Sequence, residues 1–180
     1  YRARSAFKLE EIDKKDKLLR PGLNVVDLGA APGGWCQYAR KKLGNKSRLI
    51  AVDLLPIEPI EGVEIIQGNF TEEQVRQQIN DKVDNKAFDL VLSDMAPNIS
   101  GIALADQARS IDLAEGVLDW SRLVLAVDGG LLMKVFQGSG FDQLRKELLL
   151  NFRSVAVRKP GASRSRSAEV YLLARGFKGI

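Results

Sequence analysis

The stretch VVDLGAAPGGW, residues 25–35, decides how this chain folds. Its first four residues are apolar apart from Asp27, which predicts a buried strand, and the glycines and proline that follow predict a tight turn. A helix should begin near Gly34. Because Gly29, Gly33 and Gly34 lack side chains, a ligand can approach the backbone, and the start of the helix directs free N–H groups toward it. The pattern therefore predicts a site for a nucleotide-like ligand.

The residues of the turn distinguish between ligands that use such a site. A P-loop requires Gly-Lys-Ser/Thr at the helix start, whereas here Gly33 and Gly34 are followed by Trp35, so no lysine meets a phosphate. A dinucleotide fingerprint has a glycine where this turn has Ala31, which would partly block a pyrophosphate. Asp27 at the strand end suits a cationic or amine-bearing ligand, which points to S-adenosylmethionine. The alternative is an ordinary strand-to-helix turn of an α/β domain.

The length and composition are those of one globular domain, which we expect to span residues 1–180. The chain is 45% hydrophobic and 28% charged, and no apolar run approaches the length of a membrane span. It has a single cysteine, Cys36, and no histidine, so we expect a reducing, cytoplasmic setting, no metal and a buried, inert thiol. Proton transfer must then use Asp, Glu, Lys or Tyr. We also expect a monomer and, because the chain opens on Tyr1, a native start upstream.

Basic residues are concentrated toward the C-terminus. The 27 Lys and Arg only slightly exceed the 23 Asp and Glu, but residues 152–180 hold seven basic side chains and one acid, Glu169. Residues 1–4 and 41–48 add further basic groups. This distribution favours nucleic acid as a partner if the basic segments share one face of the protein. Ordinary solubilising charge is the alternative.

Strand and helix patterns alternate along the chain. Apolar runs predict strands at residues 25–28, 48–53, 63–67, 88–93, 130–136, 153–158 and 169–174. Helical spacing predicts helices at residues 5–19, 34–43, from 71, 104–126 and 141–151, with Ser5 as a cap and residues 71–74 as a capping box. The order predicts an α/β, Rossmann-like, doubly wound and mostly parallel sheet of seven strands with helices on both faces.

The end of the chain departs from this alternation. No helix separates the last two predicted strands, so they should pair as a hairpin with the last strand antiparallel. Residues 159–168, between them, are rich in Pro, Gly, Ser and Arg and should form a mobile basic loop.

Polar residues stand at the ends of the predicted strands, where α/β proteins bind ligands. Asp53 ends the second strand, at a position where a carboxylate can accept both ribose hydroxyls of an adenosine ligand. Asn69 follows the third strand and would lie beside the adenine. An acid that merely caps a surface loop is the alternative for Asp53.

Four charged residues are hard to explain as solvated surface groups. Lys134 lies inside the apolar run LLMKVF, Asp94 ends the fourth strand, Glu169 opens the last strand, and Lys8 lies on the leading helix. Buried charges must be paired, so we expect the four to converge. The cluster is then either catalytic or a structural ion-pair network. A lysine can take a proton from an acceptor hydroxyl if its amine is kept neutral, which neighbouring carboxylates oppose.

Six segments, in this order and spacing, closely resemble the FtsJ (RrmJ) ribose 2′-O-methyltransferases, in particular those that act on bacterial large-subunit ribosomal RNA. They are YRARSAFKL, VVDLGAAPGGW, SDMAPN, KVFQGSGFD, RKP and SAEVYL. The resemblance spans nearly the whole chain and implies a class I methyltransferase fold with S-adenosyl-L-methionine as cofactor. It implies a catalytic tetrad of Lys8, Asp94, Lys134 and Glu169, with Lys134 as general base. It also implies cofactor contacts at Gly33, Trp35, Asp53, Asn69 and Asp94.

The resemblance also bears on the substrate and on one departure from the family. The family commonly has aspartate at the position of Asn69, and a neutral amide is a weaker acceptor for the adenine amino group. The implied substrate is a uridine of the ribosomal A-loop in an assembled large subunit. Relatives with the same tetrad modify tRNA anticodon loops or mRNA caps. Two competing hypotheses are a nicotinamide-dependent oxidoreductase, which Ala31 disfavours, and an RNA-binding module without catalysis.

Overall fold

The computed structural model describes residues 1–164 and 167–179. One sheet of seven strands has the order β3-β2-β1-β4-β5-β7-β6. The strands are β1 (Val25–Leu28), β2 (Leu49–Asp53), β3 (Glu64–Gln67), β4 (Phe88–Ser93), β5 (Leu125–Phe136), β6 (Phe152–Arg158) and β7 (Glu169–Phe177). The helices are α1 (Ser5–Asp16), α2 (Gly34–Leu43), α3 (Glu73–Lys82), α4 (Ala103–Val124) and α5 (Phe141–Asn151).

The sheet brings the ends of its central strands to one edge. All four residues of β1 are buried, and β1 pairs in parallel with β2 and with β4. The pairing of β4 with β5 is also parallel, whereas β7 runs antiparallel to both β5 and β6. The predicted mostly parallel, seven-stranded sheet and its antiparallel last strand are therefore confirmed. The C-terminal ends of β1, β2, β4 and β5 meet at one edge, where open α/β sheets bind ligands.

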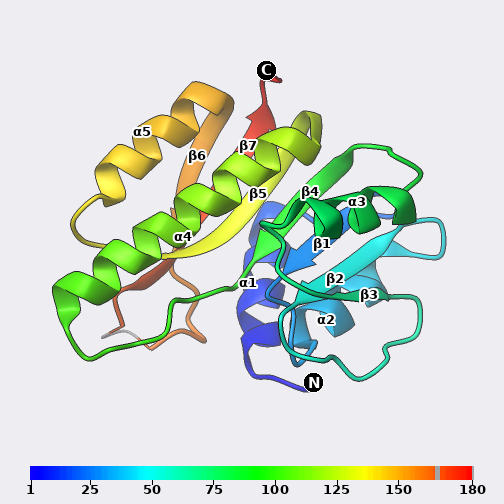
Figure 1. Ribbon diagram of the computed structural model, residues 1–180, viewed down its shortest axis with the longest axis horizontal. Coiled ribbons are helices and arrows are strands. Elements are labelled where there is room, and N and C mark those ends of the chain that lie inside the picture. The colour runs from blue at the N-terminus through cyan, green and yellow to red at the C-terminus, as the bar shows by residue number, and fades with distance from the viewer. Residues whose placement is uncertain (165–166, 180) are drawn as a thin grey trace.

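Helices cover both faces of the sheet (Figure 1). Helices α3, α4 and α5 pack on one face, where Ile79, Leu118 and Leu144 join the core. Helices α1 and α2 pack on the other face, where Leu9 and Tyr38 are buried. The prediction of helices on both faces is confirmed, because each face is apolar and needs a covering layer.

The leading helix is shorter than predicted and is not capped by Ser5. Lys17 has left-handed backbone angles and ends α1 after Asp16, although the apolar pattern continues through Leu18 and Leu19, which are buried outside the helix. The Leu19 N–H instead donates to the Asp13 carboxylate at 2.8 Å. Ser5 is the first helical residue and no side chain caps α1. Leu18 and Leu19 are apolar because they are buried, and they therefore continue the apolar pattern beyond the last residue of the helix.

Helix α3 also begins differently from the prediction. Its first residue is Glu73, and no side-chain capping bond forms, so the capping box at residues 71–74 is wrong. The Thr71 N–H and hydroxyl both donate to Asn69 Oδ1, at 2.9 and 2.7 Å. Thr71 therefore belongs to a turn closed by Asn69, which competes with its use as a helix cap.

The last strands are longer than predicted. β5 begins at Leu125, directly after α4, and its pairing with β4 shifts register between Phe88 and Leu90. β7 continues to Phe177, which packs on Phe152 at the start of β6. Residues 165 and 166 of the predicted mobile loop lie outside the described residues. No helix within the described part of the chain has the length and apolar character needed to cross a membrane.

Candidate active site

The glycine turn joins β1 to α2 and packs closely on its surroundings. The N–H groups of Gly29 and Ala30 donate to the Val52 carbonyl, at 2.8 and 3.1 Å, which fixes the turn to the end of β2. Gly29 has φ +70°, and a Cβ there would lie 2.1 Å from Met95 Cγ. A side chain at this position would clash with the loop that follows β4, so glycine is required for packing as well as for backbone conformation.

The other two glycines of the turn are in contact with the protein itself. A Cβ on Gly33, which has φ +119°, would lie 2.7 Å from Ile60 Cδ1, and a Cβ on Gly34 would lie 3.2 Å from the Cβ of Ala3. The sequence suggested that these glycines open the backbone to a ligand. The structure adds a second reason, because they admit the N-terminal segment and the β2–β3 loop.

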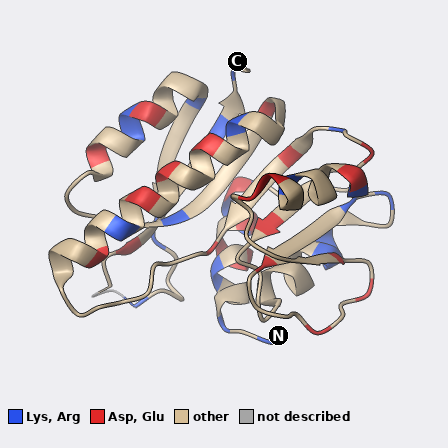
Figure 2. Ribbon diagram, viewed as in Figure 1, with Lys and Arg blue, Asp and Glu red and all other residues tan. Residues whose placement is uncertain are grey.

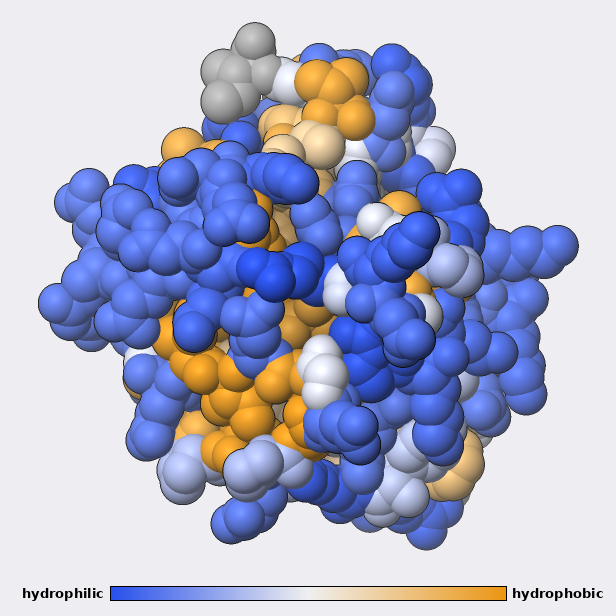
Figure 3. Space-filling view, turned by 90° about the vertical axis from the view of Figure 1, so that its right-hand side faces the viewer, coloured by the Kyte–Doolittle hydropathy of each residue, from blue (hydrophilic) through white to orange (hydrophobic). Residues whose placement is uncertain are grey.

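A cleft of about 880 Å³ lies at the C-terminal edge of the sheet. Its lining includes Gly29, Asp53, Leu55, Asn69, Asp94 and Met95. Leu55 is exposed. Apolar residues gather among hydrophilic ones on one face of the molecule (Figure 3). A second cleft, of about 840 Å³, lies beside α2 and β3, but there Arg40 and Arg48 bond to Gly62 and Glu64. Of these two clefts, the first contains the residues predicted from the sequence.

Two of the predicted cofactor residues already accept hydrogen bonds within the protein. The Asp53 carboxylate accepts from the N–H groups of Ala31 and Leu55, at 2.8 and 2.9 Å. Its two oxygens still have free lone pairs, so it can also accept ligand hydroxyls. The Asn69 oxygen is occupied by Thr71. The Asn69 NH₂ group, rather than the oxygen expected from the sequence, is therefore the part of this side chain that has no hydrogen-bond partner among the described residues.

Asp27 lies beneath the turn, outside the main cleft. It is fully buried beside a cavity of about 20 Å³ that is also lined by Gly29, Trp35 and Asp94. Its Oδ2 accepts a hydrogen bond from the Cys36 thiol at 3.2 Å, and its Oδ1 has no partner among the described residues. Burial raises the pKa of Asp27 to about 8 and raises the pKa of Cys36 well above its ordinary value. Cys36 is a buried thiol, as expected.

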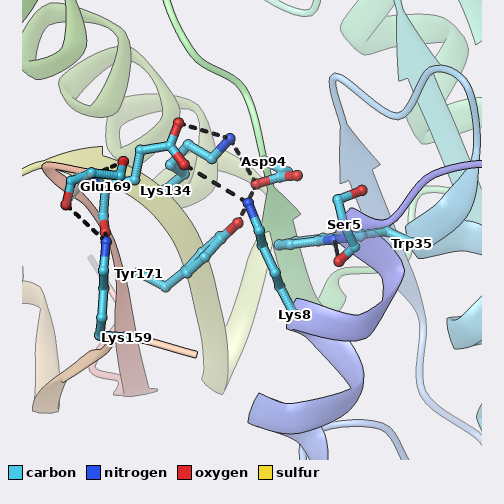
Figure 4. Close-up of polar contacts among 9 residues, drawn as sticks. Ser5, Lys8, Trp35, Asp94, Lys134, Lys159, Glu169 and Tyr171 are labelled. Atoms are coloured by element: carbon cyan, nitrogen blue, oxygen red, sulfur yellow. Dashed lines mark hydrogen bonds and ion pairs between the residues drawn. The ribbon is translucent and has the colours of Figure 1, made fainter. Parts of the chain in front are cut away.

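The four charged residues predicted to converge do so (Figure 4). Lys134 Nζ lies 3.2 Å from Asp94 Oδ1 and 3.7 Å from Glu169 Oε1, and Lys8 Nζ lies 3.8 Å from Glu169 Oε2. The side chains of Lys134 and Asp94 are only 11% and 16% exposed. We call these four residues the tetrad. Asp94 also lines the cleft, so the tetrad and the cleft adjoin.

Tyr171 belongs to this cluster and was not predicted. Its hydroxyl donates to Asp94 Oδ1 at 2.5 Å, and it lies opposite Lys134 in the pairing of β5 with β7. Burial raises the pKa of Tyr171, so its hydroxyl stays protonated as a donor. Burial also raises the pKa of Asp94, against the opposing effects of Lys134 and the Tyr171 hydroxyl. The sequence did carry a signal for Tyr171. It lies two residues after Glu169 on the same strand, and residues two apart on a strand share a face.

Helix α1 carries Lys8 and is held against the glycine turn. The Trp35 indole N–H donates to the Ser5 carbonyl at 2.8 Å, and the Trp35 ring packs on Tyr171 with centroids 5.7 Å apart. Trp35 is thus buried between the turn, α1 and β7. Its side chain connects the glycine turn with α1 and with Tyr171, which contacts Asp94 of the tetrad.

Many of the basic residues near the C-terminus have partners within the protein. Arg158 forms two hydrogen bonds with the Asp16 carboxylate, at 2.8 and 2.9 Å, and Arg153 pairs with Asp128. Lys159 donates to the carbonyls of Ser167 and Glu169. Lys and Arg also lie among Asp and Glu on the visible helices (Figure 2). Arg166 lies outside the described residues. The count of basic residues therefore overstated the free positive charge of this segment.

The strand order, with β7 inserted antiparallel between β5 and β6, is that of the Rossmann-like class I methyltransferases. The ligand cleft follows β1 as in this class, and the lysine and carboxylate groups beside it can move a proton. Within the described residues no cluster of three or more His, Cys, Asp and Glu side chains is arranged for a metal ion. The chain is a methyltransferase of this class.

Residues 1–177 match the FtsJ-like methyltransferase family, and the chain belongs to that family. It is 58% identical over 173 residues to the ribosomal RNA large subunit methyltransferase E of Azoarcus sp. (strain BH72), covering 96% of this chain and 84% of the relative. The protein of the same name from Alkalilimnicola ehrlichii is 54% identical over 177 residues, covering 98% and 85%. A crystal structure from Plasmodium falciparum, described as a ribosomal RNA methyltransferase, has a TM-score of 0.91 at 28% identity, with both chains covered in full.

Proposed function

We propose that this enzyme uses S-adenosylmethionine to methylate a ribose 2′-oxygen in large-subunit ribosomal RNA, and that it acts in the cytoplasm. Relatives above 50% identity are named for ribosomal RNA large subunit methylation. The resemblance of the tetrad segments to the FtsJ enzymes further implies a uridine of the A-loop. The observation that carries the proposal is Lys134, whose amine lies close to two carboxylates, one of which, Asp94, lines the cleft.

The residues of the cleft fit S-adenosylmethionine. Asp53 has lone pairs left for the ribose hydroxyls, Leu55 and Met95 offer apolar surface for the adenine, and the Asn69 NH₂ group can donate to a ring nitrogen. Asp27 Oδ1 is a buried oxygen without a hydrogen-bond partner among the described residues, and such groups are rare unless a ligand or water completes them. A polar group of a ligand near this cavity would supply the missing hydrogen bond.

The tetrad supplies positioning and a proton acceptor. When bound, S-adenosylmethionine supplies a methyl group on a positively charged sulfur. Lys134 Nζ would take the proton of the ribose 2′-hydroxyl as that oxygen accepts the methyl group that the cofactor would supply. Lys8 and Glu169 hold the approaching ribose in place. General-base assistance of this kind is worth about 10²- to 10⁴-fold in rate.

Opposing effects act on a lysine in this position. Neighbouring carboxylates favour the ammonium form of a lysine, whereas burial favours the neutral amine. Lys134 Nζ lies 3.2 Å from Asp94 Oδ1 and 3.7 Å from Glu169 Oε1, and its side chain is largely buried. The proposed role requires the neutral amine, because only that form has a lone pair for the proton of the hydroxyl.

The test is methyl transfer to four substrates in parallel. Large subunits and free ribosomal RNA from cells lacking the enzyme, tRNA and capped RNA are incubated with methyl-labelled S-adenosylmethionine. We expect label in large-subunit RNA, at a phosphodiester that resists alkaline hydrolysis, because a methylated 2′-oxygen cannot attack the phosphate. Label in a base, or preferential labelling of tRNA or capped RNA, would refute the proposed substrate.

A further inference from the structure

Arg2 lies where the N-terminal segment crosses the glycine turn. Its Nη1 donates to the carbonyls of Pro32 and Glu58, at 3.1 and 2.6 Å, and its Nη2 donates to the carbonyl of Pro59 at 2.9 Å. Its main-chain N–H donates to the Gln37 side chain on α2 at 2.7 Å. Three of the five guanidinium N–H groups are therefore used to join the turn to the β2–β3 loop.

The packing around Arg2 is close on the side of the turn. A Cβ on Gly33 would lie 3.3 Å from Arg2 Nη1, and a Cβ on Gly34 would lie within 3.2 to 3.3 Å of the Cβ, O and N atoms of Ala3. Glycine at both positions allows the N-terminal segment to lie directly on the turn. The contact between the N-terminal segment and the turn therefore depends on these two glycines. It also places the Arg2 guanidinium beside the three carbonyls that it contacts.

The segment held by Arg2 leads directly into the tetrad. Helix α1 begins at Ser5, whose carbonyl accepts the Trp35 indole hydrogen bond, and Lys8 lies one turn further on and pairs with Glu169. The loop on the other side of Arg2 begins after Asp53 and contains Leu55, and both residues line the cleft. Arg2 therefore connects the lining of the cleft with the helix that carries Lys8.

We propose that Arg2 is a positioning residue for the cofactor site, which holds the glycine turn and the β2–β3 loop at the spacing that binds S-adenosylmethionine, and that it is not an RNA phosphate contact. The inference rests on the proposed function. An arginine fork spans carbonyls of two segments, whereas a lysine ammonium is a compact point charge that cannot. A phosphate contact, by contrast, needs mainly the charge, so lysine would largely preserve it.

Calorimetric titration of the full-length protein with S-adenosylmethionine, without RNA, tests this inference. We expect the dissociation constant to rise about tenfold for both Arg2→Ala and Arg2→Lys, as the loss of one to three hydrogen bonds would give. Arg4→Ala is the matched control, since Arg4 is exposed in the same basic segment. It should leave the dissociation constant unchanged. In steady-state assays, the KM for S-adenosylmethionine should rise for both Arg2 variants while the KM for RNA stays the same.

Two further measurements separate positioning from phosphate contact and from general loss of structure. The salt dependence of RNA binding should keep its slope in Arg2→Ala, whereas loss of one phosphate contact would reduce that slope by about 0.7 to 0.9. Amide hydrogen exchange of the free protein should accelerate at residues 31–36 and 57–60 in Arg2→Ala and stay unchanged in β4 and β5.

The possible outcomes are distinct. Unchanged cofactor affinity in Arg2→Ala, or recovery in Arg2→Lys together with a reduced salt slope in Arg2→Ala, would overturn the inference. If the unmodified protein itself fails to bind S-adenosylmethionine, the proposed function fails, and hydrogen exchange alone still decides whether Arg2 holds the turn.

Discussion

The glycine-turn region, residues 25–70, and the tetrad region, where α1, β4, β5 and β7 meet, hold their polar groups in different ways. In the glycine-turn region, main-chain N–H groups close by in space fix the side chains, as Ala31 and Leu55 fix Asp53. In the tetrad region, side chains fix one another across long sequence separations, as Lys8 does with Glu169. The groups proposed to bind the cofactor thus come mostly from this stretch and are joined by Asp94 and Met95 after β4, whereas the proposed proton acceptor depends on the assembly of the whole sheet.

This contrast predicts that binding and chemistry can be lost separately. Replacements of Lys8, Lys134 or Glu169 should reduce methyl transfer without weakening the binding of the cofactor. Replacements in the glycine-turn region should weaken the binding of the cofactor first.

The largest effect is expected for Lys134→Arg. Arginine keeps the positive charge between Asp94 and Glu169 but does not release its proton in proteins, so it cannot act as a base. Single-turnover methyl transfer should fall about 10³-fold, while the dissociation constant of S-adenosylmethionine changes less than about twofold. Lys146→Arg, at an exposed position on α5, is the matched control and should transfer at the normal rate. Substantial activity in Lys134→Arg would exclude Lys134 as the general base.

Gly29→Ala should damage the glycine-turn region. The added Cβ overlaps Met95 and the backbone has φ +70°, so overpacking and strain should lower the free energy of unfolding by about 1–3 kcal/mol. Binding of S-adenosylmethionine should weaken in parallel. Urea unfolding and calorimetry measure both quantities. Gly116→Ala, at a helical position with open space around it, serves as the stability control and should be neutral or stabilising. Equal stabilities of the two variants would contradict the packing argument.

Asp27→Asn should change how the free energy of unfolding depends on pH, because it removes the buried carboxyl group beneath the turn. The pKa of Asp27 is about 8 in the folded protein and 3.8 when unperturbed, so the folded state binds more protons between these values. The stability from this group is present below pH 3.8 and is lost as the pH rises toward 8. From pH 5 to 8, urea unfolding should show the native protein losing up to roughly 1.4 kcal/mol per pH unit relative to Asp27→Asn. A constant difference would mean that Asp27 is ionised throughout.

The smallest effect is expected for Tyr171→Phe. The Tyr171 hydroxyl lowers the pKa of Asp94 by donating to it, so its removal should raise that pKa further. We expect a rate loss of about three- to tenfold, in line with one hydrogen bond, and a shift of the acidic limb of the pH–rate profile to higher pH. Cofactor affinity should not change. A pH profile that keeps its position would show that Tyr171 does not act through Asp94.

The same contrast explains what the sequence could and could not predict. The strand β1 and helix α2 were predicted to the residue, because their signals are local: an apolar run, glycines and the start of a periodic pattern. The convergence of the tetrad was also predictable, since a lysine within an apolar strand needs partners. The end of α1 was not, because buried Leu18 and Leu19 continue the pattern after the backbone has turned at Lys17.

Features that depend on register or on long-range partners were missed. Tyr171 contacts Asp94 because β7 pairs antiparallel with β5 in a particular register. The sequence alone does not predict that register. The partners of Arg158 and Arg2 lie far away along the chain, so these residues were counted as free charge. Thr71 satisfied a capping pattern but is held by Asn69 instead. In each case the side chain is bonded to a group that the local sequence pattern did not indicate.

If the proposed mechanism holds, a methyl donor in the glycine-turn cleft faces the amine of Lys134, and a crystal structure of the protein with S-adenosylmethionine would show whether it does. We expect ribose hydroxyls on Asp53, adenine between Leu55 and Met95, and the methyl group directed toward Lys134 Nζ beside Asp94. A cofactor bound outside this cleft, or a methyl group directed away from the tetrad, would exclude the proposed mechanism.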